Sequence, residues 1–317
     1  SAPTTLRWVK GHAGTLGNEE ADKLANLGAG KARAEALPPA PLQYIRRGAA
    51  LRGITQRIAY LGVRHRKRKE DRQATVRMLD QVTAALEAQT GIRPTEVKVW
   101  KAIRSRDMPR KVRDFWWKAL HDALRVGGFW MHIPGYETRA ICDACGCEES
   151  LEHIMLECDA PGQKTIWSEV RQLLRQAGID VPLANLGSIL GAPAADLTEK
   201  LPKSTAGGRR LYKILIVEAT HLIWKIRCER VIEHGNDPDR WPSVGELTGR
   251  WKATINRRFA MDQILTASRF EKKATPRDRV LQTWGEVVIN REALPKDWIG
   301  KPGVLVGILQ HQLTGVG

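Results

Sequence analysis

Apolar residues recur every three or four positions along most of the chain, and this spacing places them on one face of an α-helix. Leu79, Val82 and Leu86 show the pattern. By this criterion we predict helices at about 18–28, 51–61, 76–86, 96–126, 166–177, 209–234 and 246–267. The short run Leu6–Val9 favours a β-strand. The pattern therefore predicts a mostly α fold: a small strand–helix element at the N-terminus, then bundle-like helical segments.

The stretches between these helices differ in character. Residues 36–42 read ALPPAPL and predict a semi-rigid linker, because neighbouring prolines favour an extended backbone. Residues 180–208 are rich in Ala, Gly, Ser and Thr and predict a loose connection. The most apolar stretch, 211–226, is interrupted by charged and polar side chains, so it predicts a buried helix and not a membrane span. A short apolar run at 304–309 has no predicted partner.

Positive charge is concentrated in three stretches of the chain. The whole chain has 51 Lys and Arg against 35 Asp and Glu, a formal net charge of +16. Residues 44–77, 98–118 and 250–279 contain 28 of these basic residues and only seven acidic ones. Clustered positive charge suits a polyanion, because each neutralised phosphate releases condensed counterions. We therefore expect nucleic acid as the partner. A basic surface that serves only solubility is the alternative.

Two basic runs supply the candidate phosphate contacts. Between the runs and around them lie Trp100, Trp116, Trp117 and Trp251, which could stack on unpaired bases, although most of the eleven Trp are expected in the core. A nuclear-targeting signal and a solvated helix face remain open for the first run. The candidates are Arg64, Arg66, Lys67, Arg68 and Lys69 in the first run, and Arg110, Lys111 and Arg113 in the second.

The N-terminal residues and the spacing of the cysteines indicate the cellular compartment in which the protein is located. The first twenty residues contain charges and no apolar segment of the kind found in signal peptides. Three of the five Cys lie within 142–147, which is unlike a secreted disulfide framework. We expect an intracellular location, the nucleus included, and no membrane partner. The chain opens with Ser1 instead of Met, which suggests a fragment or a processed product.

The strongest chemical signal is CDACGCEESLEHIMLEC at residues 142–158. Cys142 and Cys145 can hold one ion from a tight turn, and His153 and Cys158 can complete a tetrahedron. Structural Zn²⁺ takes such sets of three Cys and one His. The spacing therefore predicts a structural zinc site formed by these four residues.

Other interpretations of this cluster stay open. Cys147 could replace Cys145 as a ligand, although a turn at Gly146 favours Cys145. A redox CxxC motif is an alternative that lacks the usual surrounding βαβ pattern. The remaining alternatives are ordinary buried thiols and a degenerate metal site. Cys228, inside a predicted helix, is expected to be a core thiol.

Two segments resemble known families. Residues 9–14 (VKGHAG) and 17–25 (GNEEADKLA) resemble the last strand, His loop and last helix of a type-1 ribonuclease H domain. Val99–Trp167 resembles the zinc-binding region of non-LTR retrotransposon reverse transcriptases, through WKAIR, RDFWWKALHD, the CxxC pair, the EH dipeptide and the final Cys. The order of the two segments is similar to that in fungal proteins derived from such elements.

The ribonuclease H resemblance implies cleavage of the RNA strand of an RNA–DNA hybrid by two carboxylate-bound divalent ions. It implies that Asp22 is the final Mg²⁺-binding carboxylate and that His12 assists proton transfer or product release. The family's other carboxylates lie further toward the N-terminus, and no Asp or Glu precedes Trp8 here. One carboxylate cannot hold two Mg²⁺ ions. We therefore expect this chain alone to lack hydrolase activity, and Mg²⁺ to bind only if the site is completed.

These resemblances imply a division of the chain and a function. We expect a retrotransposon-derived protein that binds nucleic acid of the RNA–DNA hybrid class. One alternative is an active hybrid ribonuclease whose N-terminal half is supplied separately, and another is a non-catalytic, zinc-stabilised interaction protein. The expected segments are a ribonuclease H remnant at 1–32, a Pro-rich linker at 33–43, a basic helical segment at 44–92, a reverse-transcriptase-type zinc module at 96–170, and a C-terminal helical region with an apolar tail at 209–317.

Overall fold

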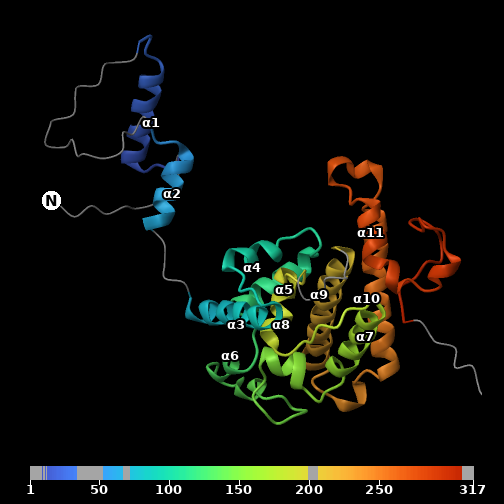
Figure 1. The fold of residues 1–317 in the computed structure, drawn as a ribbon. Helices are drawn as coiled ribbons and strands as arrows, with labels where there is room; N and C mark the ends of the chain where they lie inside the picture. Colours follow the sequence, from blue (N-terminus) through green and yellow to red (C-terminus); the bar gives the residue numbers. More distant parts are fainter. Residues whose placement is uncertain are drawn as a thin grey trace, which may run out of the picture. The chain divides into compact units, whose positions relative to one another are not determined.

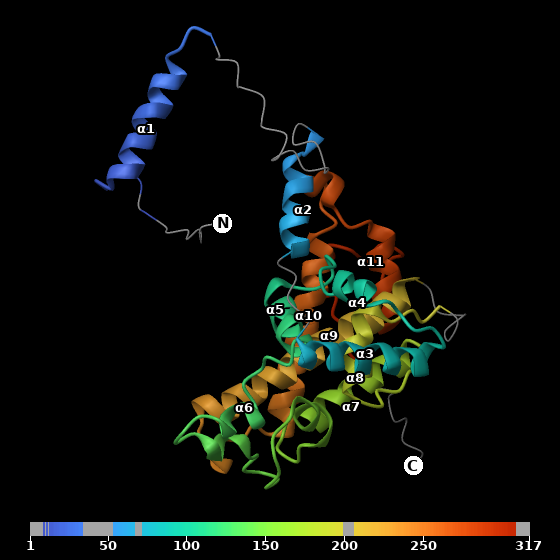
Figure 2. The same cartoon turned by 90° about the vertical axis from the view of Figure 1, so that its left-hand side faces the viewer.

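The computed structural model describes residues 9, 11, 13–33, 53–66, 72–198 and 206–308, which belong to two compact units divided between Lys69 and Glu70 (Figures 1 and 2). Regular structure in these ranges is helical apart from two isolated β-bridges. The prediction of a mostly α fold is therefore confirmed. The division lies inside the predicted basic segment 44–92, and the predicted domain boundaries stay predictions.

The N-terminal unit contains α1 (Leu16–Ala29) and α2 (Gln56–Arg66), and neither helix has a buried residue among those described. The cap of α1 is Thr15, so the helix begins two residues earlier than the predicted start at about residue 18. Leu24 and Leu27 of α1 are both more than two-thirds exposed. The predicted strand, apart from Val9, and the predicted linker lie outside the described residues.

The larger unit is built around α9 (Ala206–Cys228), which has 14 buried residues distributed around the helix. Each buried Leu, Ile or Val side chain contributes about 1.5–3 kcal/mol through removal of its surface from water. This confirms the predicted buried helix, and within the described residues no helix has the length and apolarity to cross a membrane. The helices packed directly on α9 are α5 (Arg110–Leu120), α7 (Gln163–Gln176), α10 (Val244–Ile264) and α11 (Arg277–Trp284).

Helix α3 and several shorter elements complete this unit (Figure 1). Helix α3 (Gln73–Thr90) follows its predicted course, with Leu79, Val82 and Leu86 buried. The other elements are α4 (Glu96–Ala102), α6 (Gly128–Met131), α8 (Leu186–Gly191), the π-turns η4 (His153–Glu157) and η6 (Glu229–Glu233), and the 3₁₀ turns η3 (Glu137–Ala140), η5 (Ala192–Ala194), η7 (Pro238–Arg240), η8 (Ser268–Lys273), η9 (Gly285–Val287) and η10 (Arg291–Ala293).

Helix α8 corrects the expectation of a loose connection at 180–208, because every one of its residues is buried. Its start is fixed by a reciprocal cap in which the Ser188 N–H donates to Asn185 Oδ1 at 2.9 Å and the Asn185 N–H donates to Ser188 Oγ at 3.3 Å. A Cβ at Gly187 would lie 2.6 Å from the Gln81 carbonyl oxygen of α3. The small residues that suggested a loop instead allow two helices to approach closely.

The predicted helix at 96–126 is divided into α4 and α5 by a turn in which Ile103 and Met108 are buried. Pro109 precedes α5, and a proline ring at this position opposes continuation of the preceding helix. Arg113 fixes the turn: its Nε donates to the Met108 carbonyl at 2.8 Å and its Nη2 to the Ser105 carbonyl at 3.0 Å. The turn directs Asp107 toward the N-terminal part of α9.

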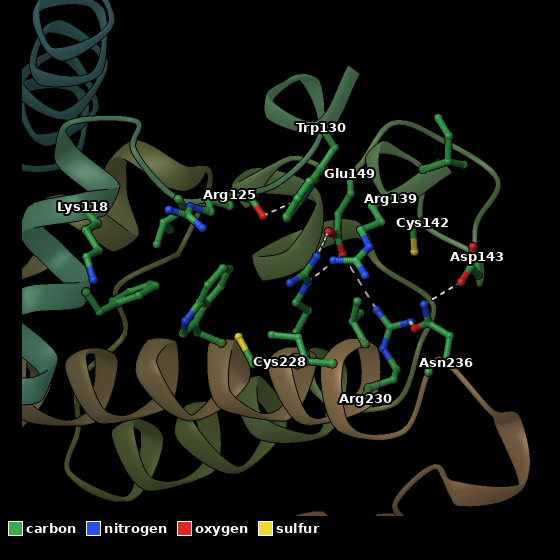
Figure 3. A pocket seen from close by; sticks show the side chains of 18 of the residues that line it. Lys118, Arg125, Trp130, Arg139, Cys142, Asp143, Glu149, Cys228, Arg230 and Asn236 are labelled. Carbon is green, nitrogen blue, oxygen red and sulfur yellow. Dashed lines mark hydrogen bonds and ion pairs between the residues drawn. The ribbon is translucent and has the colours of Figure 1, made fainter. Parts of the chain in front are cut away.

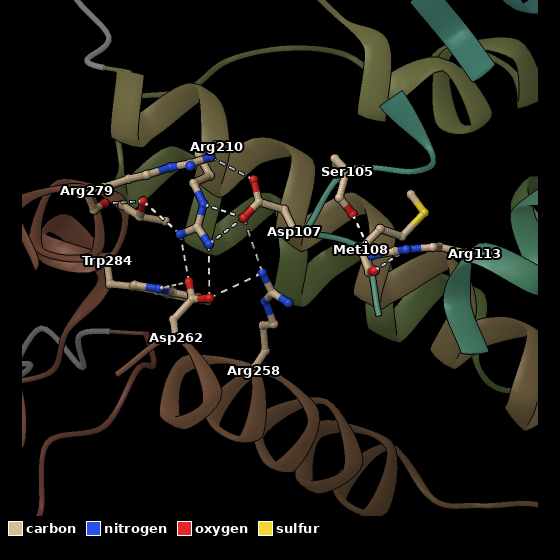
Figure 4. A network of polar contacts seen from close by, with 10 residues as sticks. Ser105, Asp107, Met108, Arg113, Arg210, Arg258, Asp262, Arg279 and Trp284 are labelled. Atoms are coloured by element: carbon tan, nitrogen blue, oxygen red, sulfur yellow. Dashed lines mark hydrogen bonds and ion pairs between the residues drawn. The ribbon is translucent and has the colours of Figure 1, made fainter. Parts of the chain in front are cut away.

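Asp107 enters a closed network of charged groups around Arg210 of α9 (Figure 4). Arg210 donates to Asp107 Oδ1 at 2.7 and 2.9 Å and to both oxygens of Asp262 at 2.7 and 3.0 Å. The Trp284 indole N–H also donates to Asp262, at 2.9 Å. Burial alone would raise the pKa of Asp107, but its hydrogen bonds to Arg210 and the charges of Arg210, Arg279 and Arg258 lower it.

The C-terminal apolar run docks on the core. Val306 is 1% exposed and forms an isolated antiparallel bridge with Val288. The Asn256 side chain accepts from the Val306 N–H at 2.8 Å and donates to the Val306 carbonyl at 2.9 Å. Residues 309–317 lie outside the described part of the chain. The run that lacked a predicted partner thus packs against η9 and α10.

The tryptophans near the basic stretches are only partly available for stacking. Trp116 and Trp251 are fully buried, and the Trp116 indole N–H donates to the Leu190 carbonyl at 3.0 Å. Trp100 is half-buried and stacks on His121, whereas Trp117 is 50% exposed. Trp116 and Trp251 thus lie in the core, where most of the tryptophans were expected, and of these four only Trp100 and Trp117 are accessible.

Candidate metal centre and the adjoining groove

A tight turn places the first cysteines. The Cys142 N–H donates to the Cys147 carbonyl at 2.8 Å, and the Gly146 N–H donates to the Cys142 carbonyl at 2.7 Å. Gly146 has φ +69°, a left-handed conformation that favours glycine. An isolated bridge between Ile141 and Glu148 closes the turn. The CxxC spacing thus yields a small knuckle with its thiols directed toward the chain that follows.

The π-turn η4 brings the later donors to this knuckle. Ser150 Oγ accepts from the His153 N–H at 3.0 Å, and the Cys158 N–H donates to the His153 carbonyl at 2.8 Å. The latter bond spans five residues, which is the π-helical pattern. The Trp167 indole N–H donates to the Met155 carbonyl at 2.7 Å and ties this turn to α7.

The donor distances fit a tetrahedral zinc site. The Sγ atom of Cys158 lies 3.8 Å from that of Cys142 and 3.9 Å from that of Cys145. Zn–S bonds of about 2.3 Å in a tetrahedron place two sulfurs about 3.8 Å apart. One ligand atom from each of Cys142, Cys145, His153 and Cys158 lies within 4.8 Å of the others, and this is the sole such group in the described ranges. The four predicted ligands are therefore brought together.

The donor residues of the centre are mostly buried, and this burial changes the pKa of a thiol. Cys142, His153 and Cys158 are each at most 5% exposed. Burial, followed by the neighbouring thiols of Cys142 and Cys145, raises the pKa of Cys158 to about 12. The Asp159 N–H lies 3.2 Å from Cys145 Sγ, where it donates to the sulfur. Such N–H···S contacts orient metal-bound thiolates.

Cys147 lies beside the centre without belonging to the four-donor group. Its Sγ is 3.5 Å from His153 Nδ1, and the residue is exposed. The gathered set contains Cys145, and Cys147 remains the alternative that the sequence left open. Cys228 is half-buried and lines the groove described next, so it is not a fully enclosed core thiol.

A groove of about 900 Å³ adjoins the knuckle and runs between it, α5 and the C-terminal part of α9 (Figure 3). Cys142 and Asp143 lie on its knuckle side, Lys118 on α5, and Trp130 on α6. A Cβ at Gly127, where φ is +49°, would lie 2.1 Å from the Glu149 carbonyl oxygen. Glycine at this position therefore allows the α6 segment to close against the knuckle and form a wall of the groove.

The floor of the groove contains a buried charge cluster. Arg227 of α9 makes a bidentate pair with Glu149, with its Nε at 3.0 Å from Oε1, and Arg230 Nη2 lies 3.9 Å from the same oxygen. Arg230 also donates to Asn236 Oδ1 at 2.6 Å, and Asn236 donates to Asp143. These contacts tie η6 to the residue that follows the first cysteine.

The basic residues predicted to contact phosphate lie in different places in the structure. Arg110 and Lys111 on α5 are exposed, and Lys111 lines the groove, whereas Arg113 holds the turn before α5. Arg64 and Arg66 form the exposed last turn of α2. Lys67, Arg68 and Lys69 lie outside the described residues. The role of all these residues in nucleic-acid binding stays a prediction.

Of the two residues predicted from the ribonuclease H resemblance, only Asp22 is among the described residues. Asp22 lies in α1 and is half-exposed, and it is not in the metal-capable group found among the described residues. His12 lies outside the described residues. Their catalytic roles, and Mg²⁺ binding by Asp22, stay predictions.

Sequence reasoning missed most of the cations around the groove. Lys118, Arg125, Arg139, Arg227 and Arg230 come from three separate parts of the chain and line one cavity. Arg125 and Arg139 are single basic residues among polar and apolar neighbours, so no run drew attention to them. The available signal was their proximity in sequence to Trp130 and the Cys cluster, which a search for basic runs does not use.

The comparisons with known proteins bear on this part of the chain. Residues 81–167 match the family model for zinc-binding in reverse transcriptase. The comparisons with curated proteins and with solved structures gave no match. The matched segment begins inside α3, ends at Trp167 and includes all four donor residues. Residues 81–167 are therefore similar to the zinc-binding region of reverse transcriptases, as the motifs in Val99–Trp167 indicated.

Proposed function

We propose that this chain is a zinc-stabilised nucleic-acid-binding protein of retrotransposon origin, located inside the cell, the nucleus included. The observation that carries the proposal is the gathering of three thiols and one imidazole at tetrahedral spacing, within a segment similar to reverse-transcriptase zinc-binding regions. A positively charged groove beside these donors supplies the contact surface.

Cys142, Cys145, His153 and Cys158 would hold the zinc ion. All four protein donors are present, which suits a structural ion without an open position for substrate. The chain's own residues then join three elements around the ion: the knuckle, η4 and, through Asn236, the end of α9. The function of the metal here is to fix the groove wall against α9.

Nucleic-acid binding is tested by its salt dependence. The full chain is titrated into labelled single strands, duplex DNA and RNA–DNA hybrid at several salt concentrations. We expect the logarithm of the binding constant to fall linearly with the logarithm of salt concentration, because phosphate contacts release counterions. Affinity that is independent of salt, or the lack of binding at physiological salt, would contradict the proposal. Zinc-dependent folding without binding would support an interaction protein instead.

Zinc binding is tested separately. Elemental analysis should find one zinc per chain, and Cys142→Ser should abolish it. Cys147→Ser is the matched control: it should retain the ion if Cys145 is the ligand and lose it if Cys147 is. Absence of stoichiometric metal in the purified chain would refute the site.

We further propose that the first 32 residues descend from a ribonuclease H domain, with His12 and Asp22 as its last catalytic residues. The motif order VKGHAG and GNEEADKLA supports this ancestry. Labelled RNA–DNA hybrid is incubated with the chain and Mg²⁺, with and without an added N-terminal ribonuclease H fragment. We expect no cleavage by the chain alone. Cleavage that appears with the fragment and disappears in Asp22→Asn would establish a retained catalytic role.

A further inference from the structure

The groove beside the knuckle contains cations that the described protein does not neutralise. Lys111, Arg125 and Arg139 are exposed and line it, and none of them has a carboxylate within ion-pair distance among the described residues. Lys118 also lines the groove, but it pairs with Asp114 at 2.7 Å. The rim therefore presents positive charge to whatever enters.

The floor of the groove also has more positive than negative groups, and here they are buried. Arg227 and Arg230 are 8% and 4% exposed, and the buried carboxylate of Glu149 is shared between them. Asp143 reaches Arg230 only indirectly, through Asn236. Two buried guanidinium groups against one carboxylate leave a net positive charge where solvation is poor, which is costly without a further anion. An anionic group in the groove would compensate it.

Aromatic rings are interleaved with these cations. The Arg139 guanidinium lies 5.2 Å from the ring centre of half-buried Trp130 and 4.7 Å from that of Tyr136. Trp224, also half-buried, lines the cavity from α9 and carries Arg227 at 5.5 Å. Aromatic rings and guanidinium planes are the groups on which unpaired bases stack. His221 also lines the cavity, and burial, followed by the charges of Lys225 and Lys111, lowers its pKa to about 4.

The groups that line the cavity favour unpaired over base-paired nucleic acid. In a duplex the base faces are covered by neighbouring base pairs, so Trp130 and Arg139 can stack only on bases that are unpaired. A volume of about 900 Å³ accommodates a few nucleotides of single strand.

We propose that the groove between the cysteine knuckle, α5 and α9 binds an unpaired stretch of nucleic acid. Lys111, Arg125 and Arg139 contact its phosphates, and a base stacks at Trp130. This inference rests on the proposed nucleic-acid function and adds the place of binding and the state of the strand, because the hybrid duplex expected from the sequence does not offer free base faces.

The test uses the zinc-loaded full chain and a fluorescein-labelled ten-nucleotide uridine strand, with binding followed by anisotropy. The groove variant is Arg125→Gln/Arg139→Gln. Its matched control is Arg104→Gln/Arg106→Gln, which removes the same charge from exposed residues that do not line the groove. We expect the groove variant to raise Kd about tenfold or more and the control less than about threefold, because stacking and phosphate contacts are lost together. Equal melting temperatures show that both variants fold.

The outcomes separate the two proposals. Equal weakening by both double variants means diffuse binding over the basic surface, which overturns the groove and leaves nucleic-acid binding intact. Competition by RNA–DNA hybrid duplex that is stronger than competition by unlabelled single strand also overturns it. Poly-glutamate that competes as well as the single strand assigns the groove to acidic peptides and overturns it. No binding of any nucleic acid by the native chain overturns both proposals.

Discussion

The two parts of α9 that carry arginine differ in how their charges are satisfied. Near its start, Arg210 donates to both Asp107 and Asp262, and Trp284 and Thr283 complete the closed network (Figure 4). At its end, Arg227 shares Glu149 with Arg230 of the following π-turn η6, and both face a groove (Figure 3). The first, closed network places two carboxylates among Arg210, Arg258 and Arg279 and ties neighbouring elements together. The second, open cluster of Arg227, Arg230 and Glu149 lines a groove, which leaves a place for an anion. The same residue type on one helix thus has a structural role in one place and a proposed binding role in the other.

Metal removal should cause the largest loss of stability among these changes. The loss should be confined to the cysteine knuckle and the open cluster beside it. Chelation, or Cys142→Ser, removes a contribution of up to about 10 kcal/mol, the scale of structural zinc in small peptides. We expect hydrogen exchange to accelerate across 140–158 and 227–236, while amides of 207–215 near Arg210 stay protected. Cys147→Ser should leave both regions unchanged. Uniform loss of protection along α9 would show that the two parts are not independent.

Asp262→Ala should have the next largest effect, at the closed network. It leaves Arg210 and Arg258 buried beside one remaining carboxylate, and breaking a buried pair of this kind costs about 3–5 kcal/mol. Urea unfolding measures the change in the free energy of unfolding. Asp297→Ala removes the exposed partner of Arg277 and should lower the free energy of unfolding far less, because a surface ion pair contributes little to stability. Similar losses for the two variants would contradict the structural role of the network.

Glu149→Gln should destabilise the open cluster by a smaller amount, about 1–3 kcal/mol, because the neutral amide oxygen can still accept a hydrogen bond from Arg227. Saturating single-stranded oligonucleotide should recover part of this loss, since a ligand that binds only the folded state stabilises it. Thermal melts with and without oligonucleotide measure the recovery. Asp262→Ala should gain no more from the oligonucleotide than the native chain does.

The smallest effect concerns pH. Burial and nearby lysines lower the pKa of His221 to about 4 from an ordinary value of 6.5. Between these values the unfolded chain binds a proton that the folded chain excludes, so the free energy of unfolding falls as pH decreases from 6.5 toward 4. His221→Gln should reduce this slope in urea unfolding at pH 6.5 and 4.5. His132→Gln, at an exposed position, should leave the slope unchanged. Equal slopes in all three proteins would contradict the assignment.

The sequence predicted the helical elements that depend on local spacing. The buried helix at 211–226, the helix at 76–86 and the four gathered donors follow from apolar periodicity or from a short motif. Each of these features is specified within about thirty residues, so a single stretch of chain contains the information. The error at 96–126 arose because Pro109 and the partner of Asp107 outweigh the helical pattern.

The features that the sequence did not predict depend on contacts between distant segments. Helix α8 was missed because its small residues serve to pack closely against α3, about a hundred residues earlier in the chain. The groove was missed because Arg125, Arg139 and Arg227 meet only after the knuckle and α9 pack together. The sequence also did not show which tryptophans near the basic stretches are buried, because charge does not show which side of a helix faces the core; Trp116 and Trp251 face it.

The π-turn between His153 and Cys158 has a consequence for how this segment can change during evolution. Its five-residue hydrogen bond sets the rotation at which Cys158 leaves the turn. Deleting one residue would rotate Cys158 by about 100° around the axis, since successive helical residues differ by that angle. Lengthening the turn by one residue would rotate it equally far in the other direction. Insertions and deletions at 154–157 are therefore not tolerable, and descendants of this sequence that keep the ion must keep this interval.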